Sequence, residues 1–293
     1  MICGPTAAGK TSVGIALGQA LNGEVISADS RQFYTEMSIG TAKPTTAEMQ
    51  RIPHHFIDHC SIDSPITAGE FERQGEQRVQ EILSRKKLPV VVGGSGLFIR
   101  SLMEGLDDLP SNGNLRQELI AQYENEGLPS LLDRLAKSDP DAKKSIDHKN
   151  QVRVMRAIEL VELSGKPLAA VRNQIKTEKA FEPIWIGITP EREVLYERID
   201  QRVDQMMEAG LEAEVRSLER HRDTDALKTV GYKELFSFFD GAYDLNEAIR
   251  LIKRNSRHYA KRQLTWFRKI DGIKWFEPEQ VDEVKEYVNS QIV

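Results

Sequence analysis

Cysteine is nearly absent from the 293-residue sequence, which contains only Cys3 and Cys60, far apart in the chain. Two separated cysteines exclude a zinc ribbon and do not predict a structural disulfide in a reducing compartment. We therefore expect both to be small buried residues. Long hydrophobic runs are absent as well, because a stretch such as "LPVVVGGSGLFI" holds at most five consecutive apolar residues. A membrane span needs about 20.

Targeting signals and biased composition are also absent. The start of the sequence has no basic region followed by an apolar segment and a cleavage site, so we expect a cytoplasmic protein with no membrane partner. A hydrophobic content of 40% without any low-complexity tract predicts a globular chain with one large domain or two smaller ones. We expect it to be a monomer. The net charge of −5 by itself predicts no polyanionic partner.

The first third of the chain alternates between strand and helix patterns. The apolar stub "MIC" is followed by a glycine turn, by "KTSVGIALGQAL" with apolar residues at helical spacing, and by the β-rich run "EVISA". This order is the βαβ unit of a parallel sheet. Residues 71–87 have a helical pattern, and "LPVVV" is typical of a strand buried on both faces. The first strand is short for a central one, so we expect part of it to precede Met1.

The motif "GPTAAGKT" lies between the first predicted strand and the first predicted helix and fits the P-loop pattern G-x-x-x-x-G-K-[ST]. Gly4 and Gly9 allow backbone N–H groups to curl around phosphate oxygens, and the helix N-terminus adds about half a positive charge. Lys10 supplies a point charge, and the Thr11 hydroxyl can bind Mg²⁺. The loop also contains Pro5, Thr6, Ala7 and Ala8. The alternative is a glycine turn that happens to precede a helix, and the motif does not distinguish a nucleotide from another diphosphate.

Residues 112–179 have a different pattern, which is charged, helical and free of strands. Helices are predicted over residues 115–127, 129–138, 150–165 and 167–179. The strand "IWIGI" follows, and after it helices are predicted nearly to the end. The sequence therefore predicts an α/β fold: a P-loop parallel sheet flanked by helices, built from residues 1–111 and 180–293, with an inserted all-helical subdomain.

Asp29 follows the strand "EVISA", and ligands of open α/β sheets bind at the carboxyl ends of strands. A carboxylate there can accept a proton from a nucleophile or hold Mg²⁺ through water. The alternative is a helix cap, for which Asp is well suited. The strand "LPVVVGG" ends in glycine, whereas many nucleotide hydrolases have a metal-binding Asp at this point. This absence argues against an ATPase or GTPase.

Two basic regions remain. Arg153 and Arg156 are spaced to share a helix face, as ordinary surface arginines also could. The stretch from Arg250 to Lys269 contains eight Lys or Arg and no acidic residue, which indicates a polyphosphate partner. Its cations at helical spacing are Arg250, Arg254, Arg257 and Lys261, and its interleaved aromatics are Tyr259, Trp266 and Phe267. Surface ion pairs are the alternative for the cations, and core packing is the alternative for at least two of the aromatics.

Eight strings occur in an order that resembles the bacterial tRNA dimethylallyltransferase family, also called tRNA isopentenyltransferases. They are "GPTAAGKT", "ISADSRQFY", "IGTAKP", "HHFID", "VVVGGSGLF", "RVMRAIE", "VGYKEL" and "YAKRQLTWFR". The resemblance extends from Gly4 to about Arg268. It implies transfer of a dimethylallyl group from dimethylallyl diphosphate to N6 of adenosine 37, next to the anticodon of tRNA, with release of diphosphate.

The resemblance also assigns roles by position. Residues 6–11 would hold the diphosphate with Thr11 on Mg²⁺, and Asp29 would take the proton from N6. Residues 30–32 would help to hold the flipped adenine. The positions that match tRNA contacts are Asp29, Ser30, Arg31, Gln32, Ser95, Arg116, Val152, Arg153 and Arg156. Ser95 stands where the family usually has Thr, and Val152 replaces one of two adjacent arginines. To these the charge pattern adds Arg254, Arg257 and Lys261 as tRNA contacts.

Three other functions stay open from the sequence. A P-loop small-molecule kinase would use the same loop on ATP with Asp29 as base toward a hydroxyl, but the helical insertion and the basic stretch would then lack a role. A non-catalytic nucleotide switch would need a metal-binding residue at a strand end. Enzymes that prenylate free adenine nucleotides share the loop, so tRNA as the acceptor depends on the basic stretch and the distinctive strings.

Overall fold

The computed structural model describes residues 1–105, 112–172 and 179–292, and the chain forms two compact units. Met1–Met103 and Phe181–Val293 make up the first unit, and Glu104–Ala180 makes up the second. The predicted helical insertion, residues 112–179, falls within the second unit.

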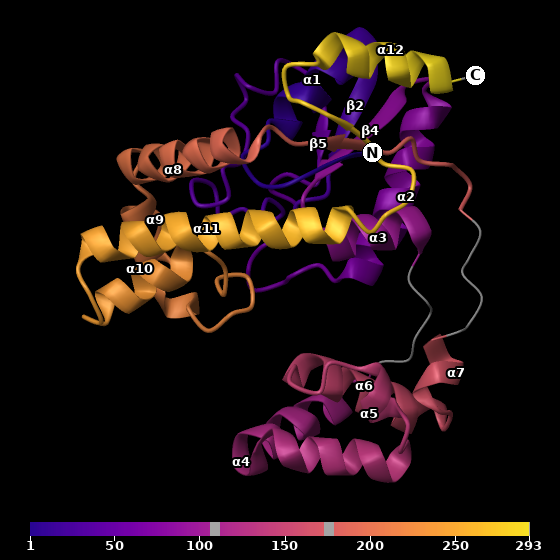
Figure 1. Ribbon diagram of the computed structural model, residues 1–293, viewed down its shortest axis with the longest axis vertical. Helices are drawn as coiled ribbons and strands as arrows, with labels where there is room; N and C mark the ends of the chain where they lie inside the picture. Colours follow the sequence, from indigo (N-terminus) through magenta and orange to yellow (C-terminus); the bar gives the residue numbers. More distant parts are fainter. Residues whose placement is uncertain (106–111, 173–178, 293) are drawn as a thin grey trace. The chain divides into compact units, whose positions relative to one another are not determined.

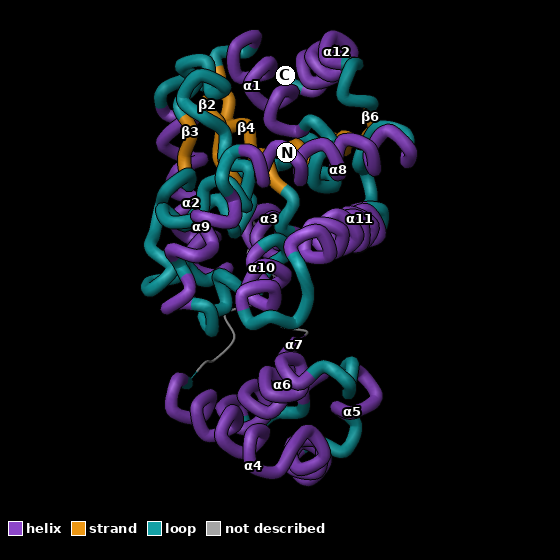
Figure 2. The backbone as a smooth tube through the Cα atoms, turned by 90° about the vertical axis from the view of Figure 1, so that its left-hand side faces the viewer, coloured by secondary structure: helices purple, strands orange, loops and turns teal. Residues whose placement is uncertain are grey.

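The first unit contains a six-stranded sheet in the order β3-β2-β4-β1-β5-β6, in which every neighbouring pair is parallel. Figure 2 shows the strands running from β3 at one edge to β6 at the other. The strands are β1 (Ile2–Cys3), β2 (Gly23–Ser27), β3 (His54–His55), β4 (Leu88–Gly93), β5 (Ile186–Ile188) and β6 (Lys274–Phe276). The predicted α/β fold with a parallel sheet is confirmed.

Alternate side chains of the central strands enter two different cores. Val90 and Val92 pack with Val13 and Leu17 of α1 (Lys10–Ala20), together with apolar residues of α8 (Arg192–Glu208) and α12 (Val281–Gln291). Val91 points to the opposite face and packs with residues of α2 (Ala68–Ser84) and α3 (Gly96–Glu104). In Figure 1, α1 and α12 accordingly cover one face of the sheet, and α2 and α3 cover the other. Because both faces are buried, β4 is an uninterrupted apolar run, as predicted.

Eight α-helices belong to the described part of the first unit. They are α1 (Lys10–Ala20), α2 (Ala68–Ser84), α3 (Gly96–Glu104), α8 (Arg192–Glu208), α9 (Leu211–Ser217), α10 (Tyr232–Phe239), α11 (Leu245–Phe267) and α12 (Val281–Gln291), with a 3₁₀ turn at Glu219–His221. A capping box starts α2, in which the Thr67 side chain accepts from the Glu70 N–H and the Glu70 carboxylate accepts from the Thr67 N–H. The side chain of Asp244 accepts from the Glu247 N–H and caps α11.

A further core lies where α8, α9, α10 and α11 meet. It contains the fully buried Tyr232 of α10 with Val203, Leu211 and Ile252 from the other three helices. Glu214 of α9 joins this core to the loop that follows β2. Its carboxylate accepts from three consecutive backbone N–H groups, those of residues 38–40, and from the Tyr232 hydroxyl.

The second unit is helical in the part that the structure describes. It contains α4 (Gly113–Ser138), α5 (Ala142–Ser145), α6 (Gln151–Ser164) and α7 (Leu168–Arg172), packed around an apolar core of their own. The two helices predicted over residues 115–127 and 129–138 form α4, which is interrupted at Gly127, where φ is 77°. Of the helix predicted over residues 167–179, residues 173–178 lie outside the described residues.

Two short strands were not predicted. The sequence pattern indicates only helices after Ile188, and this prediction is wrong because β6 pairs with β5 from Lys274 to Phe276. The edge strand β3 pairs with β2 at only two positions. Strands of two or three residues give too short a pattern for alternation to be recognised. No helix within the described ranges combines the length and apolarity that crossing a membrane requires.

The amino end of β2 carries a buried acidic residue with three cationic or imidazole partners. Glu24 is 4% exposed, and its carboxylate lies 2.8 Å from His55 Nε2, 2.8 Å from Arg85 Nη2 and 3.0 Å from Lys87 Nζ. Burial alone would raise the pKa of Glu24, but the hydrogen bonds from its partners lower it to about 2. This cluster ties β2, β3 and the start of β4 together.

Replacing Glu24 by Gln should destabilise the fold at neutral pH. A pKa of about 2 instead of the ordinary 4.5 corresponds to about 3 kcal/mol, and we expect about 2 kcal/mol because Arg85 and Lys87 are partly exposed. The ionised carboxylate is the stabilising form, so its contribution is complete above pH 4.5 and is lost as pH falls toward 2. Urea unfolding of both proteins over this pH range measures the difference.

Glu283→Gln on the exposed surface of α12 is the matched control. Its free energy of unfolding should stay within about 0.5 kcal/mol of the wild-type value at each pH. If Glu24→Gln lowered the free energy of unfolding by the same amount at every pH, Glu24 would stabilise the fold by its shape and not by its charge.

Candidate functional site

The phosphate loop, Gly4–Thr11, connects β1 to α1 and has the backbone geometry that its glycines permit. Gly4 has a φ of 147° and Gly9 a φ of 86°, which side chains disfavour. A Cβ at Gly4 would lie 2.2 Å from the Ile188 carbonyl oxygen. No side chain of the described residues caps α1, and its first turn contains no acidic residue. Its first N–H groups are therefore available to an anion.

Lys10 reaches back over this loop. Its Nζ donates to the Pro5 carbonyl oxygen at 2.6 Å. Burial lowers the pKa of Lys10 to about 8, while the negative charge of Asp29 works in the opposite direction. The exposed Thr11 lies beside it. Both residues line a pocket of about 530 Å³, here called the phosphate-loop pocket, with Ala7, Ala8, Gly9 and Arg202 among its other lining residues.

Asp29 lies at the carboxyl ends of β2 and β4, as predicted from its place in the sequence. The Ala28 N–H donates to Val92 O at 2.7 Å, and the Ser95 N–H donates to Ala28 O at 3.3 Å, so the two strand ends are held together. One carboxylate oxygen of Asp29 accepts from the Arg31 N–H at 3.1 Å. The residues after Asp29 form a turn and not an α-helix. Asp29 is therefore not a helix cap, and its carboxylate lines a cavity.

Ser30 and Ser95 form a hydrogen-bonded pair across these strand ends. The Ser30 N–H donates to Ser95 Oγ at 2.9 Å, and the two hydroxyl oxygens are 3.1 Å apart. Gln32 uses its amide within the protein: Oε1 accepts from the Ser27 hydroxyl, and Nε2 lies 3.4 Å and 3.3 Å from the carbonyl oxygens of Thr41 and Ala42. A contact between Gln32 and a base, as the resemblance implied, would compete with these hydrogen bonds.

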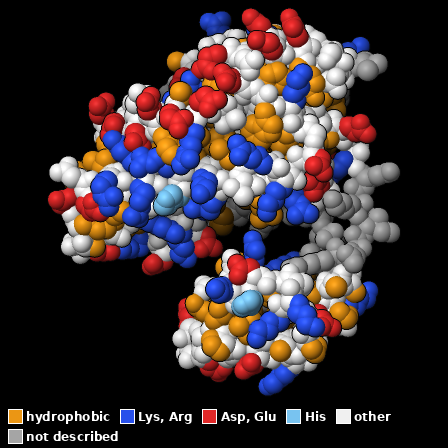
Figure 3. All heavy atoms as spheres, in the orientation of Figure 1, with side chains coloured by type: hydrophobic (Ala, Val, Ile, Leu, Met, Phe, Trp, Pro, Cys, Tyr) orange, Lys and Arg blue, Asp and Glu red, His pale blue; other side chains and the backbone are white. Residues whose placement is uncertain are grey.

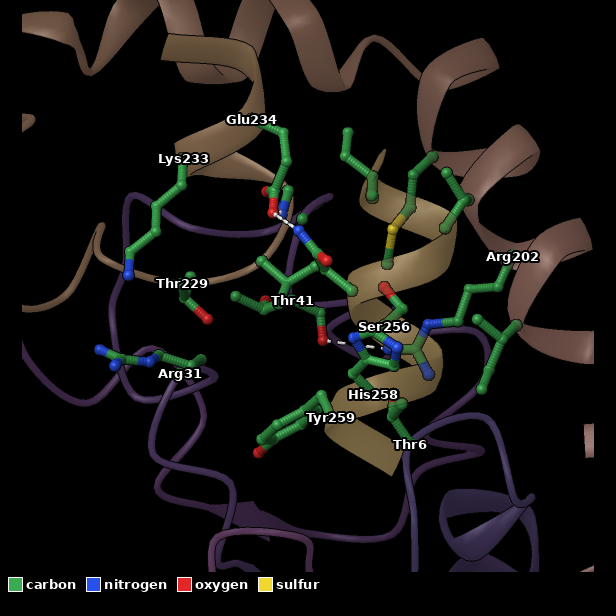
Figure 4. Close-up of a pocket in the computed structure, with 18 of the residues that line it drawn as sticks. Thr6, Arg31, Thr41, Arg202, Thr229, Lys233, Glu234, Ser256, His258 and Tyr259 are labelled. Atoms are coloured by element: carbon green, nitrogen blue, oxygen red, sulfur yellow. Dashed lines mark hydrogen bonds between the residues drawn. The ribbon is translucent and has the colours of Figure 1, made fainter. Parts of the chain in front are cut away.

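The cavity beside Asp29 has a volume of about 470 Å³ and is here called the central cavity. It is lined by residues of the loop after β2, α8, α10 and α11, and Figure 4 shows Arg31, Arg202, Lys233 and Tyr259 around it together with Thr6 of the phosphate loop. Its cationic lining residues are Arg31, Arg202, Lys228, Lys233 and Arg262, and its acidic ones are Asp29 and Glu234. Glu234 accepts from the Gly231 N–H and from Asn255. The cavity thus has a cationic excess that suits an anionic ligand.

Tyr259 of α11 also lines the central cavity. Burial raises its pKa, and the nearby negative charge of Asp29 adds to the effect, so the hydroxyl stays protonated at neutral pH. The aromatic residues of the basic stretch therefore have different environments. Tyr259 faces the cavity, Phe267 is fully buried in the core, and Trp266 is partly buried against Gly96.

Sequence analysis missed Arg202 of α8. It lines both the phosphate-loop pocket and the central cavity. Its Nη2 donates to Thr41 O at 3.3 Å, whereas its buried Nε has no hydrogen-bond partner within the described residues. Burial lowers its pKa, and Asp29 and Glu48 partly offset this. In the sequence Arg202 is one of several charged residues on a polar helix, so no local pattern distinguishes it.

The predicted basic residues of α11 are divided between ion pairs and open positions. Figure 3 shows Lys and Arg side chains gathered over this helix. Arg257 pairs with Asp200, Lys253 pairs with Asp204 at 2.6 Å, and Arg250 pairs with Glu247 at 2.6 Å. The exposed Lys261 lines a separate groove beside β5 and β6, and the exposed Arg254 donates to the neighbouring Asn255. The alternative of surface ion pairs therefore holds for Arg250 and Arg257 of the predicted set.

The second unit carries the other predicted RNA contacts on α4 and α6. Arg116 lies 3.4 Å and Arg156 3.2 Å from the carboxylate oxygens of the buried Glu159. Arg153 is exposed on α6, and Val152 is 54% exposed. The structure therefore brings Arg116 and Arg156 together, and it places an apolar side chain on the surface next to Arg153.

Comparison with known proteins gives a consistent result. The family model described as IPP transferase matches residues 32–270. The tRNA dimethylallyltransferases of Cytophaga hutchinsonii and Christiangramia forsetii are each 46% identical to this chain, over 100% and 99% of its length and 96% and 97% of theirs.

Solved structures agree with these relatives. The full-length tRNA isopentenylpyrophosphate transferase of Bacillus halodurans superposes with a TM-score of 0.74 at 39% identity, covering 99% of this chain and 95% of that one. A eukaryotic dimethylallyltransferase acting on tRNA gives a TM-score of 0.82 at 25% identity, covering 99% of this chain and 76% of its own. Similarity in sequence and structure over nearly the whole length shows that the chain belongs to the IPP transferase family.

Proposed function

We propose that this protein transfers a dimethylallyl group from dimethylallyl diphosphate to N6 of adenosine 37 in tRNA and releases diphosphate. One observation carries the proposal. Arg202 lines both the phosphate-loop pocket and the central cavity. A diphosphate bound by the loop and a base bound beside Asp29 would therefore both be neighbours of this residue. The relatives that this chain resembles are tRNA dimethylallyltransferases by name.

The donor side of the site suits an allylic diphosphate. Negative charge grows on the departing oxygen as the carbon–oxygen bond breaks. The N–H groups at the start of α1, the Lys10 ammonium and the Arg202 guanidinium would therefore stabilise the transition state more than the ground state. The buried Nε of Arg202, without a partner in the described part of the chain, is suited to such an anion.

The acceptor side must remove a proton from a weak nucleophile. N6 of adenine attacks C1 of the dimethylallyl group, the bond from C1 to oxygen breaks, and diphosphate leaves with the electron pair. The attacking nitrogen then has a proton to lose, and the Asp29 carboxylate in the central cavity would accept it. The base must leave its stack to enter the cavity, as in other enzymes that act on nucleobases.

Magnesium fits the donor side. Mg²⁺ in phosphate sites is held by one or two protein oxygens together with substrate phosphates and water. The exposed Thr11 hydroxyl in the phosphate-loop pocket supplies one such oxygen. Across the described residues no group of three or more His, Cys, Asp or Glu could hold a metal ion by itself. The donor would therefore bring most of the ligands, and the bound ion would supply positive charge against the diphosphate.

Transfer RNA would bind through cations in both units. In the first unit these are Arg31 at the central cavity and Arg254 and Lys261 of α11. Arg257 would have to exchange Asp200 for a phosphate. In the second unit Arg116, Arg153 and Arg156 are the proposed contacts. Phosphate contacts of this kind orient the RNA and carry no sequence information by themselves.

The proposed function is tested by mass spectrometry of nucleosides from tRNA incubated with the protein and dimethylallyl diphosphate. The expected product is an adenosine with one added dimethylallyl group. A parallel measurement follows ATP consumption with tRNA and with small hydroxyl compounds. ATP turnover without prenylated adenosine would replace the proposed function by a kinase.

Asp29→Asn should slow the chemical step about 10²- to 10⁴-fold, the usual range for a lost general base. The affinity for tRNA should change by less than about twofold, because the amide keeps the shape of the carboxylate. Single-turnover rates at saturating substrates and filter binding of tRNA measure the two quantities. A single-turnover rate close to that of the wild type would show that Asp29 is not the general base. Its role would then be structural, as the acceptor for the Arg31 N–H.

Lys10→Ala should weaken binding of inorganic diphosphate about 10- to 100-fold, as expected for a lost charge-assisted contact. Because the pKa of Lys10 is about 8, the ammonium is charged below this pH and neutral above it. The affinity of the wild type should therefore fall as pH rises through 8. An arginine at this position stays charged over this pH range. The affinity of Lys10→Arg for diphosphate should therefore not fall at pH 8, and any remaining pH dependence should come from the titration of diphosphate itself. Identical calorimetric pH profiles for the wild type and Lys10→Arg would exclude Lys10 from the donor site.

Lys261→Gln and Arg257→Gln form a matched pair on α11. If Lys261 contacts a phosphate, its replacement should flatten the slope of log affinity against log salt by about 0.7 to 0.9 and leave the melting temperature unchanged. Arg257→Gln removes an ion pair worth about 1 kcal/mol or less and should lower the melting temperature slightly. A tRNA salt slope unchanged in both variants would remove this part of α11 from the RNA site.

A further inference from the structure

The side chain of Gln263 in α11 forms hydrogen bonds with two backbone segments far away in the sequence. Its Oε1 accepts from the N–H of Thr6 in the phosphate loop at 2.8 Å, and its Nε2 donates to the carbonyl oxygen of Gly94 at 2.9 Å. Gln263 is only 6% exposed. Both ends of one buried amide are thus satisfied by backbone groups, which fixes the orientation of the amide.

The surroundings of this amide leave it little freedom to move. A Cβ at Gly94 would lie 2.4 Å from Gln263 Nε2 and 3.6 Å from the Gly4 carbonyl oxygen. The amide, the turn after β4 and the start of the phosphate loop are therefore in direct contact. Because the Thr6 N–H already has a partner, it serves to place the loop and is not available to a phosphate oxygen.

The helix that carries Gln263 also forms a wall of the central cavity. Tyr259 and Arg262 of α11 line that cavity, and Lys261 and Arg268 line the groove on the other side of the helix. Within the described residues, Gln263 is the only residue of α11 whose side chain forms a hydrogen bond with the phosphate loop.

We propose that Gln263 is a positioning residue, which holds the phosphate loop at a fixed place relative to α11 and the central cavity. It touches neither the donor nor the acceptor, and it acts through the Thr6 backbone. In the proposed function, on which the catalytic part of this inference rests, its effect is to keep the diphosphate aligned with the base beside Asp29. A misplaced loop would bind diphosphate less well and would also slow the transfer.

Two variants disturb the amide from opposite sides. Gln263→Met keeps the length of the side chain but removes both hydrogen bonds. Gly94→Ala keeps Gln263 in the sequence but adds a Cβ that would overlap the Nε2 atom of Gln263 and displace its amide. Calorimetry with inorganic diphosphate and Mg²⁺ should show a Kd raised about tenfold in each variant. In steady-state assays the KM for dimethylallyl diphosphate should rise and kcat should fall, whereas the Kd for tRNA should stay within about twofold.

Thr265→Val is the control on the same helix, because its hydroxyl donates to the Lys261 carbonyl oxygen of that helix. Its diphosphate Kd should match that of the wild type. If Gln263→Met and Gly94→Ala lower the melting temperature but leave the diphosphate Kd unchanged, Gln263 is a packing residue and the inference is wrong. Should Gln263→Met fail to fold, Gly94→Ala decides the question alone, since it retains the glutamine.

A double variant tests whether Gly94→Ala acts through the amide. In a Gln263→Ala background the added Cβ has no side-chain amide to displace, so Gly94→Ala should change the diphosphate Kd by no more than about twofold. Additive effects would contradict the inference. Diphosphate binding is measured without any transfer reaction, so this test does not depend on the proposed function. The proposed function fails separately, if the wild-type protein binds diphosphate but produces no prenylated adenosine.

Discussion

The carboxyl ends of the central strands approach one another so closely that side chains are excluded at two positions. A Cβ at Gly93 would lie 2.3 Å from the Ala28 carbonyl oxygen, and a Cβ at Gly4 would lie 2.2 Å from that of Ile188. This contact brings Asp29, Ser95 and the phosphate loop into one small region. It also explains why β4 ends in glycine: an aspartate at Gly93, as found in many nucleotide hydrolases, would not fit this arrangement. The same constraint therefore shapes the site and argues against nucleotide hydrolysis.

Three features that depend on local sequence or on a simple rule of topology agree with the structure. The phosphate loop is recognisable because glycine spacing, Lys10 and the adjoining strand and helix occur within one short stretch. Asp29 was placed by a topological rule, since the carboxyl ends of parallel strands lie at one edge of a sheet. The apolar run of β4 predicted a buried strand because neither of its faces meets water.

Features that depend on contacts between distant segments could not be predicted. Gln263 meets Thr6 across 257 positions, and nothing in either segment indicates the partner. Arg202 belongs to a helix with many charged residues, and only the fold shows that it lies between two pockets. The pairing of Arg257 with Asp200 could not be predicted either. The number of basic residues in a stretch does not show which of them form ion pairs. These partners are set by how side chains from different helices and loops meet in the fold. The spacing of residues along a single helix carries no information about them.

The position of Arg202 in the lining of two pockets has a consequence for how the donor and acceptor sides depend on each other. Because the phosphate-loop pocket and the central cavity share this residue, one guanidinium is a neighbour of both spaces. In the proposed reaction, the charge of a ligand in one pocket would therefore act on Arg202 and, through it, on the other pocket. The two ligands would be coupled electrostatically through a single side chain.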